Sequence, residues 1–103
     1  MTSRDFIYKL PARISPDAIE GHDTTFHFDL ESGGQYTVSI ANSQVSVSDG
    51  LIGEANCVVR ASEENFMKLI EGDLNPMMAV LTGKVKISNQ GEMLRYAKIF
   101  GLM

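Results

Sequence analysis

The two histidines, His22 and His27, are the side chains of this sequence best suited to acid–base or metal chemistry. With Asp23 and Asp29 nearby, they could act as metal ligands or as a base–acid pair. A protein metal site normally needs three or four converging ligands, however. The alternation of apolar and polar residues over 25–30 places His27 on the polar face of a strand and His22 in the loop before it. We therefore interpret both as solvated residues at a strand edge and predict no metal site.

Cys57 and the pair Glu63–Glu64 are the remaining candidates for catalysis. A reactive thiol needs an accessible, positive setting, whereas Cys57 falls on the inner face of a predicted strand and is expected to pack as a small hydrophobe. Adjacent glutamates on a helix point apart, and in a first turn they complement the helix dipole. The sequence also lacks a P-loop, a dinucleotide fingerprint, a zinc motif and a nucleophile elbow. We predict a protein without catalytic residues and without a cofactor.

The segment 72–87 is the most informative stretch of the sequence, because a short Met-rich helix lies there between Gly72 and Gly83. A helix this short is not stable alone and must pack on an apolar surface. Methionine tolerates a surface of changing shape. The four internal methionines (67, 77, 78 and 93) all follow the predicted sheet. Their residue type fits gap-filling in an ordinary core and a deformable wall of a lipid site equally well.

Composition limits the class of protein and the partners. The 103 residues suit a single domain, 1–103, and 44% hydrophobic content suffices for one core. A net charge of −4 without a basic stripe argues against nucleic acid and against a polybasic membrane anchor. Apolar runs stay well short of the roughly 20 residues of a membrane span. One cysteine and a start without an apolar leader lead us to expect a cytoplasmic protein.

Five segments read as strands, namely 25–30, 36–41, 45–48, 56–61 and 84–87, because apolar and polar residues alternate along each of them. Tight turns are expected at Gly33–Gly34 and Asn42–Ser43. The first four strands are predicted to form an antiparallel meander that is apolar on one face. Lys84 and Lys86 on the solvent face of the fifth strand suit a sheet edge. They would equally suit contact with an acidic lipid headgroup or a membrane surface.

The predicted helices are one over 4–10 that ends at Pro11, a short turn after Ser15, one from Ser62 to Gly72, the Met-rich helix, and a last one after Asn89. In the last helix Asn89 and Glu92 resemble a capping box. Its inward residues are expected to be Met93, Leu94, Ala97 and Phe100, with Leu102 and Met103 trailing. Since all helices must cover the one apolar face, the fold class is α+β, a two-layer sandwich.

Three sequence blocks carry a family resemblance: residues 55–66 (ANCVVRASEENF), 72–76 (GDLNP) and 83–87 (GKVKI). Their order and spacing are similar to those of the sterol carrier protein type-two family of lipid-binding domains. The resemblance implies a five-stranded, mainly antiparallel sheet covered on one face by helices, with an apolar tunnel between the layers. Asn56 stands where the family usually has Asp, and Asn89–Gln90 replace a usual Gly-Asp.

From this resemblance we expect non-catalytic binding or transfer of a fatty acyl chain, a sterol or a similar lipid. The alternative is a dimerising scaffold or accessory module for a lipid- or quinone-metabolising enzyme. The expected partner is a hydrophobic small molecule and not nucleic acid, while transient membrane contact and a homodimer stay open.

The inward-facing residues of the predicted sheet and helices supply the expected tunnel lining: Phe28, Tyr36, Val38, Ile40, Val47, Val59, Phe66, Ile70, Met77, Met78, Leu81, Met93, Ala97 and Phe100. Among these, Tyr36 has a hydroxyl that could orient the polar end of a ligand. Tryptophan in place of Met78 or Leu81 is expected to block binding and leave the fold intact.

Overall fold

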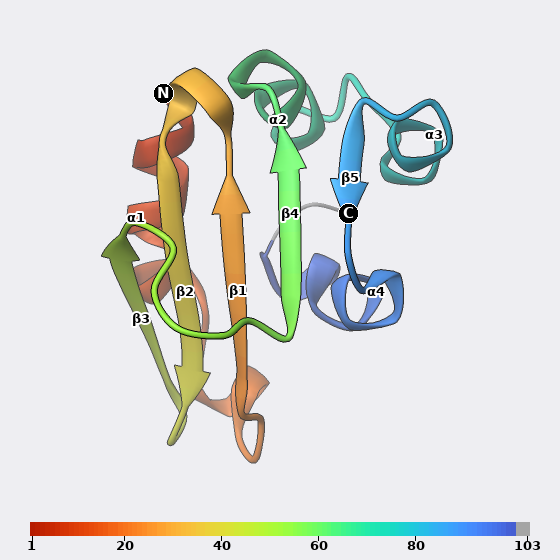
Figure 1. Cartoon of the computed structure of the whole chain (residues 1–103). Coiled ribbons are helices and arrows are strands. Elements are labelled where there is room, and N and C mark those ends of the chain that lie inside the picture. The colour runs from red at the N-terminus through yellow and green to blue at the C-terminus, as the bar shows by residue number, and fades with distance from the viewer. Residues whose placement is uncertain (101–103) are drawn as a thin grey trace.

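A computed structural model describes residues 1–100 of the chain (Figure 1). The helices are α1 (Ser3–Arg13), α2 (Glu63–Ile70), α3 (Pro76–Leu81) and α4 (Gln90–Phe100), with 3₁₀ turns at Pro16–Ile19 and Glu31–Gly33. The strands are β1 (Thr24–Asp29), β2 (Gln35–Ala41), β3 (Gln44–Asp49), β4 (Cys57–Ala61) and β5 (Val85–Ile87). This order of elements confirms the prediction. The expected trailing positions of Leu102 and Met103 lie outside the described residues.

The strands form one mixed sheet in the order β3-β2-β1-β4-β5. All neighbouring pairs are antiparallel except β1 and β4, which are parallel, with Phe28 level with Val59. The predicted four-stranded meander is therefore wrong at its fourth strand. Residues 50–56 leave β3, cross the outer face of β2 and β1, and enter β4 on the far side of β1 (Figure 1). Alternation indicates which face of a strand is buried, but it carries no information about which strand lies beside it.

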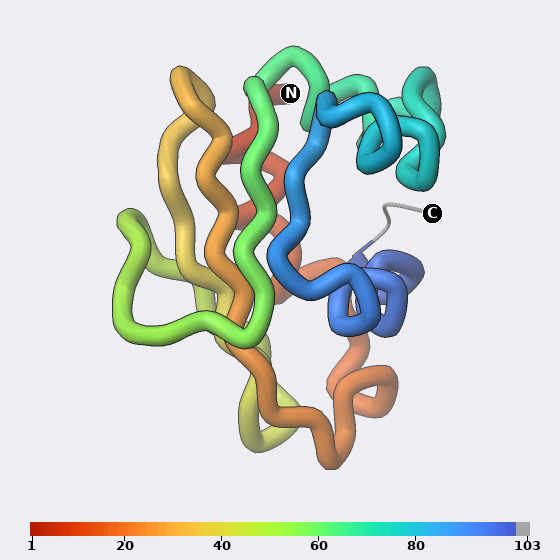
Figure 2. The backbone as a smooth tube through the Cα atoms, turned by 45° about the vertical axis from the view of Figure 1, so that its right-hand side comes forward, coloured from red at the N-terminus to blue at the C-terminus, as the bar shows by residue number. Residues whose placement is uncertain are grey.

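The helices cover the other face of the sheet (Figure 2). An aromatic cluster joins the two layers. Phe28 of β1 contacts Phe66 of α2 and Phe100 of α4, with ring centroids 5.9 and 6.2 Å apart. Phe26 lies 5.0 Å from Phe100 in an edge-to-face arrangement. These rings are almost fully buried, and such pairs contribute about 0.5–1.5 kcal/mol beyond area burial. The observed architecture is the predicted α+β sandwich.

Helix α1 does not end at Pro11, as predicted, but continues to Arg13. Proline lacks a backbone N–H and so removes one helical hydrogen bond near the end of the helix. The amide of Ile14 still closes the last turn by donating to the Leu10 carbonyl at 3.0 Å. At the other end, the hydroxyl of Thr2 accepts from the Asp5 amide while the Asp5 carboxylate accepts from the Thr2 amide. The capping box and the buried apolar face stabilise α1 by more than the hydrogen bond lost at Pro11 costs, so the helix continues past the proline.

The two predicted turns differ in how well they match the sequence expectation. Asn42 and Ser43 both adopt positive φ, as a tight two-residue hairpin requires. In the other turn, Gly34 has φ of 99° but the second left-handed residue is Glu31 and not Gly33. That connection is a 3₁₀ turn closed by the amide of Gly33 on the Leu30 carbonyl.

Candidate functional site

An apolar cavity of about 130 Å³ lies between the β4–β5 edge of the sheet and the helices α2, α3 and α4. These elements lie together at one side of the molecule (Figure 2). Among the described residues it is lined by Val59, Phe66, Leu69, Pro76, Met77, Val80, Leu81, Val85, Ile87, Gln90, Met93, Leu94 and Ala97. Twelve of these thirteen side chains are apolar, so the cavity favours a hydrophobic occupant.

The inner walls of the cavity come from the sheet and from α2. Val59 and Ile87 are paired across β4 and β5, so their side chains lie next to each other on the helix-facing surface. Ser62 caps the start of helix α2, since its hydroxyl accepts a hydrogen bond from the Asn65 amide at 3.1 Å. The helix then presents Phe66 and its i+3 neighbour Leu69 on one face, toward the cavity.

Helix α3 forms a thin outer wall. Its start is fixed by Asn75, whose side-chain oxygen accepts from the Met77 and Met78 amides. Within this six-residue helix only Ala79 is buried. Met77 and Leu81 line the cavity and yet are 56% and 77% exposed, so they stand at its mouth.

Helix α4 closes the opposite wall. The Asn89 side chain accepts from the Glu92 amide, which is half of the predicted capping box, but the Glu92 carboxylate turns to the Thr24 hydroxyl at 2.8 Å. Met93 is buried and faces the cavity. Leu94 was expected to point inward but is 50% exposed at the mouth. Tyr96, which follows the buried Met93 by three residues and so lies on the same face of the helix, is buried instead, and the sequence analysis missed it.

The structure brings together six of the fourteen residues predicted from the sequence as lining: Val59, Phe66, Met77, Leu81, Met93 and Ala97. Five others, Phe28, Tyr36, Val38, Ile40 and Phe100, are buried in the core away from the cavity. Val47 and Ile70 pack half-buried against that core, and Met78 is exposed on α3 outside the lining. We retain ligand contact as a proposal for the six that line the cavity.

Seven lining residues were missed by the sequence reading: Leu69, Pro76, Val80, Val85, Ile87, Gln90 and Leu94. Alternation in β5 and the periodicity of α2 did mark Val85, Ile87 and Leu69 as inward-facing. What the sequence could not supply is which inward side chains border a void and which pack against each other. Gln90 is the one polar side chain in this lining, and no feature of the sequence around it predicts that it borders a cavity.

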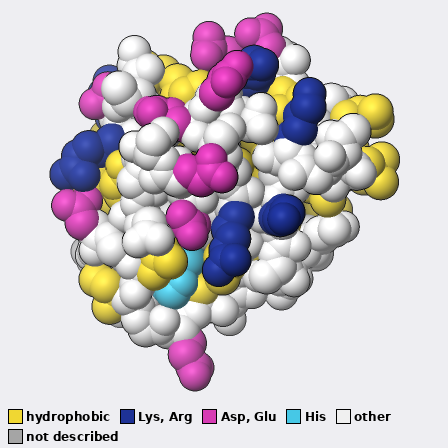
Figure 3. Space-filling view, turned by 45° about the horizontal axis from the view of Figure 1, so that its top comes forward, with side chains coloured by type: hydrophobic (Ala, Val, Ile, Leu, Met, Phe, Trp, Pro, Cys, Tyr) yellow, Lys and Arg dark blue, Asp and Glu magenta, His cyan; other side chains and the backbone are white. Residues whose placement is uncertain are grey.

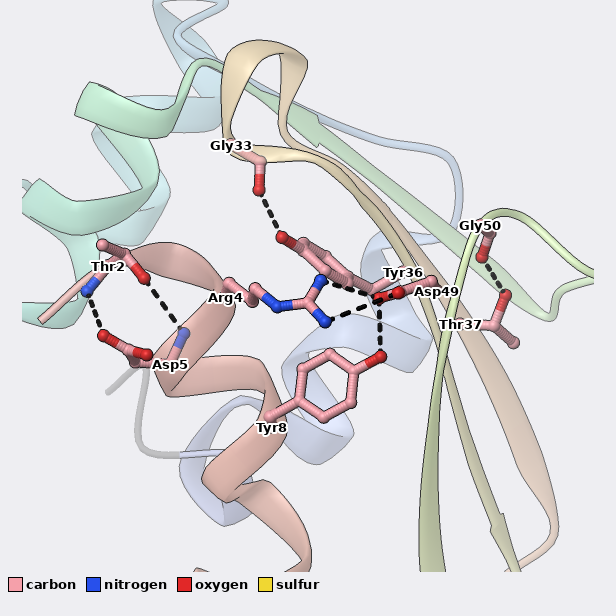
Figure 4. A network of polar contacts seen from close by, with 9 residues as sticks. All are labelled: Thr2, Arg4, Asp5, Tyr8, Gly33, Tyr36, Thr37, Asp49 and Gly50. Atoms are coloured by element: carbon pink, nitrogen blue, oxygen red, sulfur yellow. Dashed lines mark hydrogen bonds and ion pairs between the residues drawn. The ribbon is translucent and has the colours of Figure 1, made fainter.

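Tyr36 lies outside this lining, where it joins β2 to α1 (Figure 4). Its hydroxyl donates to the Gly33 carbonyl, and its ring packs edge-to-face on Tyr8, 6.0 Å away. Arg4 and Tyr8 both donate to the Asp49 carboxylate, at 2.8 and 2.6 Å. The hydrogen bond from Tyr8, and then that from Arg4, lower the pKa of Asp49. In this position Tyr36 stabilises the α1–sheet contact, and it is not part of the cavity lining.

The prediction of solvated histidines is wrong for His27, whereas His22 is half-buried in the loop before β1. His27 is only 7% exposed, and its Nε2 lies 3.0 Å from the Ile52 carbonyl, because residues 50–56 cover the outer face of the sheet. The Nδ1 of His22 lies 2.8 Å from the Tyr96 hydroxyl. Within residues 1–100 we find no group of three or more His, Cys, Asp or Glu side chains arranged to hold a metal ion.

Cys57 is fully buried on the inner face of β4, as predicted. Burial raises the pKa of its thiol, and its Sγ lies 3.5 Å from the Asn89 carbonyl. A protonated, inaccessible thiol is a poor nucleophile, so Cys57 serves packing.

No helix among residues 1–100 has the length and hydrophobicity that a bilayer crossing requires.

Comparison with known proteins assigns the sequence to a family. Residues 7–101 match the SCP-2 sterol transfer family. Hydroxysteroid dehydrogenase-like protein 2 of Bos taurus is 29% identical over 93 residues, which cover 87% of this chain. The match spans only 22% of the length of that relative.

Two solved structures share the fold. The sec-alkylsulfatase Pisa1 from Pseudomonas sp. contains a region that superposes with a TM-score of 0.80 at 23% identity, covering 100% of this chain and 16% of that one. Palmitated SCP2L2 from Aedes aegypti superposes with a TM-score of 0.73 at 20% identity, covering 97% of this chain and 95% of that one. The same domain fold therefore occurs as a small protein and as a part of a much longer one.

Proposed function

This chain belongs to the SCP-2 sterol transfer family, and we propose that it binds a fatty acyl chain, a sterol or a similar lipid without catalysing a reaction. The observation that carries the proposal is the cavity between the sheet and α2–α4, whose lining is apolar except for Gln90. Transfer of each CH₂ group from water into such a site contributes about 0.8 kcal/mol. A buried, unpaired Cys57 is compatible with a reducing cytoplasm, where we expect the protein to act.

The size of the cavity implies that it must expand to hold a lipid. Its volume of about 130 Å³ is close to that of an engineered cavity of about 150 Å³ that binds benzene, whereas pockets for larger ligands span about 300–1,000 Å³. Helix α3 is the wall best suited to move, since Ala79 is its only buried residue. We propose that an entering acyl chain displaces α3 and that Met77 changes rotamer around it.

The polar end of the ligand would remain near the mouth. Gln90 begins α4 there, and its amide group can both donate and accept hydrogen bonds. A carboxyl or hydroxyl group beside Gln90 would stay in contact with water while the apolar part is buried. We therefore propose that Gln90, and not Tyr36, orients the polar end of the ligand.

A second candidate function is an accessory domain that presents a lipid to an enzyme. Two similar proteins favour it, because the matched regions are small parts of hydroxysteroid dehydrogenase-like protein 2 and of the sec-alkylsulfatase. Both candidates require the cavity to bind a lipid. They differ in whether α3 and α4 face a bilayer or another protein domain.

The test is a titration of the delipidated protein with a fluorescent fatty acid, followed by displacement with a sterol, an acyl-CoA, a phospholipid and a quinone. We expect saturable binding with a Kd of about 1 μM, which corresponds to about −8 kcal/mol. The most effective competitor would identify the ligand class. A folded, delipidated sample without saturable binding would refute the proposal.

A matched pair of variants locates the site. Ala97→Leu adds apolar volume to a buried position that lines the cavity, so we expect affinity to fall at least tenfold. Ala12→Leu makes the same change at an exposed position on α1 and should bind as the unmodified protein does. Thermal unfolding of both variants checks that they are folded. Equal affinity in the two would place the ligand elsewhere.

A further inference from the structure

We infer that α3, the exposed residue Leu94 of α4 and the basic side chains next to α3 form a docking surface for an anionic lipid bilayer. The inference rests on the proposed function, because the apolar part of this surface borders the mouth through which a lipid would enter the cavity, while the basic side chains lie on the outer face of the adjoining strands β4 and β5. It adds the partner from which the lipid is taken or to which it is delivered.

The apolar part of the surface consists of Met77, Met78, Leu81 and Leu94, each at least half exposed. The three residues of α3 follow i, i+1, i+4 spacing and share one side of the helix. Met77, Leu81 and Leu94 also border the same cavity, so they stand around a single opening. Exposed apolar side chains that gather at one place, rather than being scattered, mark a contact surface.

The basic part lies directly beyond the end of α3. Lys84 and Lys86, together with Arg60, line a polar hollow of about 360 Å³ that contains two acids, Asp29 and Glu31. In Figure 3, Lys and Arg side chains stand on the face shown, with Asp and Glu side chains among them and a group of hydrophobic side chains at the right-hand edge. In the described part of the chain, neither lysine forms an ion pair.

The arrangement of these cations points to an anion from outside the chain. Arg60 and Lys86 are directly opposite each other on β4 and β5, and like charges in that position repel. Asp29 compensates little, since its carboxylate is 3.9 Å from the Arg60 Nε and that arginine side chain is 66% exposed. Anionic headgroups above the hollow would relieve this repulsion.

A bilayer fits both parts of the surface at once. Stable attachment to a membrane takes two signals, such as inserted apolar side chains and basic residues that meet anionic headgroups. Here the apolar tip and the cations are adjacent, and Lys84 follows Leu81 by three residues. The net charge of −4 repels the rest of the molecule from an anionic surface and so favours this orientation. With α3 in the headgroup region, a lipid could enter the cavity without crossing water.

The experiment is co-sedimentation with vesicles of phosphatidylcholine alone and with vesicles that also contain phosphatidylserine. We expect the unmodified protein to prefer the anionic vesicles and to dissociate at high salt. Lys86→Glu should weaken this binding at least fivefold, and Met78→Gln should weaken it severalfold. Lys9→Glu, the same charge reversal on exposed α1, should have much less effect. Equal binding to both vesicle types, or equal loss in Lys86→Glu and Lys9→Glu, would overturn the inference.

A fatty-acid titration without vesicles separates this inference from the proposed function. Lys86 and Met78 lie outside the cavity lining, so Lys86→Glu and Met78→Gln should keep the affinity for the fatty acid. If the unmodified protein binds the fatty acid but no vesicle, docking is refuted and lipid binding stands. If it binds anionic vesicles but no fatty acid, the proposed function is the part that fails. A dimer that is lost in Met78→Gln, without vesicle binding, would assign the surface to a second copy of the chain.

Discussion

The end of the molecule formed by α1, β2 and β3 is tied together by specific contacts, whereas the end formed by α3, β5 and α4 encloses a void. At the first end, which we call the anchored end, Arg4 and Tyr8 of α1 hold Asp49 of β3. At the second, the cavity end, α3 rests on one buried residue, Ala79. Under the proposed function, stability and ligand binding therefore depend on different parts of the molecule.

The lengths of the two helices explain the difference. Helix α1 has 11 residues and buries Phe6, Ile7 and Leu10 along one face, so its apolar stripe fixes it to the sheet. Helix α3 has six residues, too few to be stable without its surroundings. A ligand in the cavity would provide part of the apolar surface that α3 otherwise lacks. The loosely packed end is therefore the end at which binding can contribute most.

The largest expected effect comes from the aromatic cluster that joins the two layers. Phe28→Ala should lower the free energy of unfolding by about 3–5 kcal/mol, because Phe28 is 1% exposed and packs on Phe66 and Phe100. Leu81→Ala at the cavity end should change it by less than about 0.5 kcal/mol. Urea unfolding at 25 °C measures both. Comparable losses in the two variants would show that α3 carries stability after all.

A smaller effect is expected from bulk added at the mouth of the cavity. Leu81→Trp should weaken fatty-acid binding about tenfold, or 1.4 kcal/mol, because Leu81 borders the opening. Met78→Trp, also on exposed α3 but outside the lining, should bind as the unmodified protein does. The sequence reading had expected both changes to block binding. Fluorescence titration distinguishes the two positions, and an equal effect of both would contradict the observed lining.

The sequence predicted local structure well because the relevant signals are local. Alternation located the strands, and the caps Ser62 and Asn75 located helix starts. It did not predict that β4 lies parallel to β1, or that residues 50–56 cover His27, since both depend on tertiary packing. Because the position of the void also depends on tertiary packing, the lining predicted from the sequence contained core residues as well as residues that border the cavity. The two share their chemistry, and only the position of the void separates them.

The smallest effect, and the sharpest test that the two ends are independent, concerns Asp49. Hydrogen bonds from Tyr8 and Arg4 lower the pKa of Asp49. A carboxyl group whose pKa is lowered by folding stabilises the protein above its unfolded pKa, and that contribution is lost as the pH falls through the lowered value. The stability difference between the unmodified protein and Asp49→Asn should therefore be present at pH 7 and shrink below about pH 4.

Urea unfolding at a series of pH values measures this difference, with Glu54→Gln in the exposed loop as the control. The effect should be modest and should weaken in high salt, because Arg4 and Asp49 are 56% and 62% exposed. Fatty-acid affinity should be the same in Asp49→Asn and in the unmodified protein, since Asp49 lies outside the cavity lining. A change in affinity would mean that the anchored end controls the shape of the cavity, and the division of roles between the two ends would have to be abandoned.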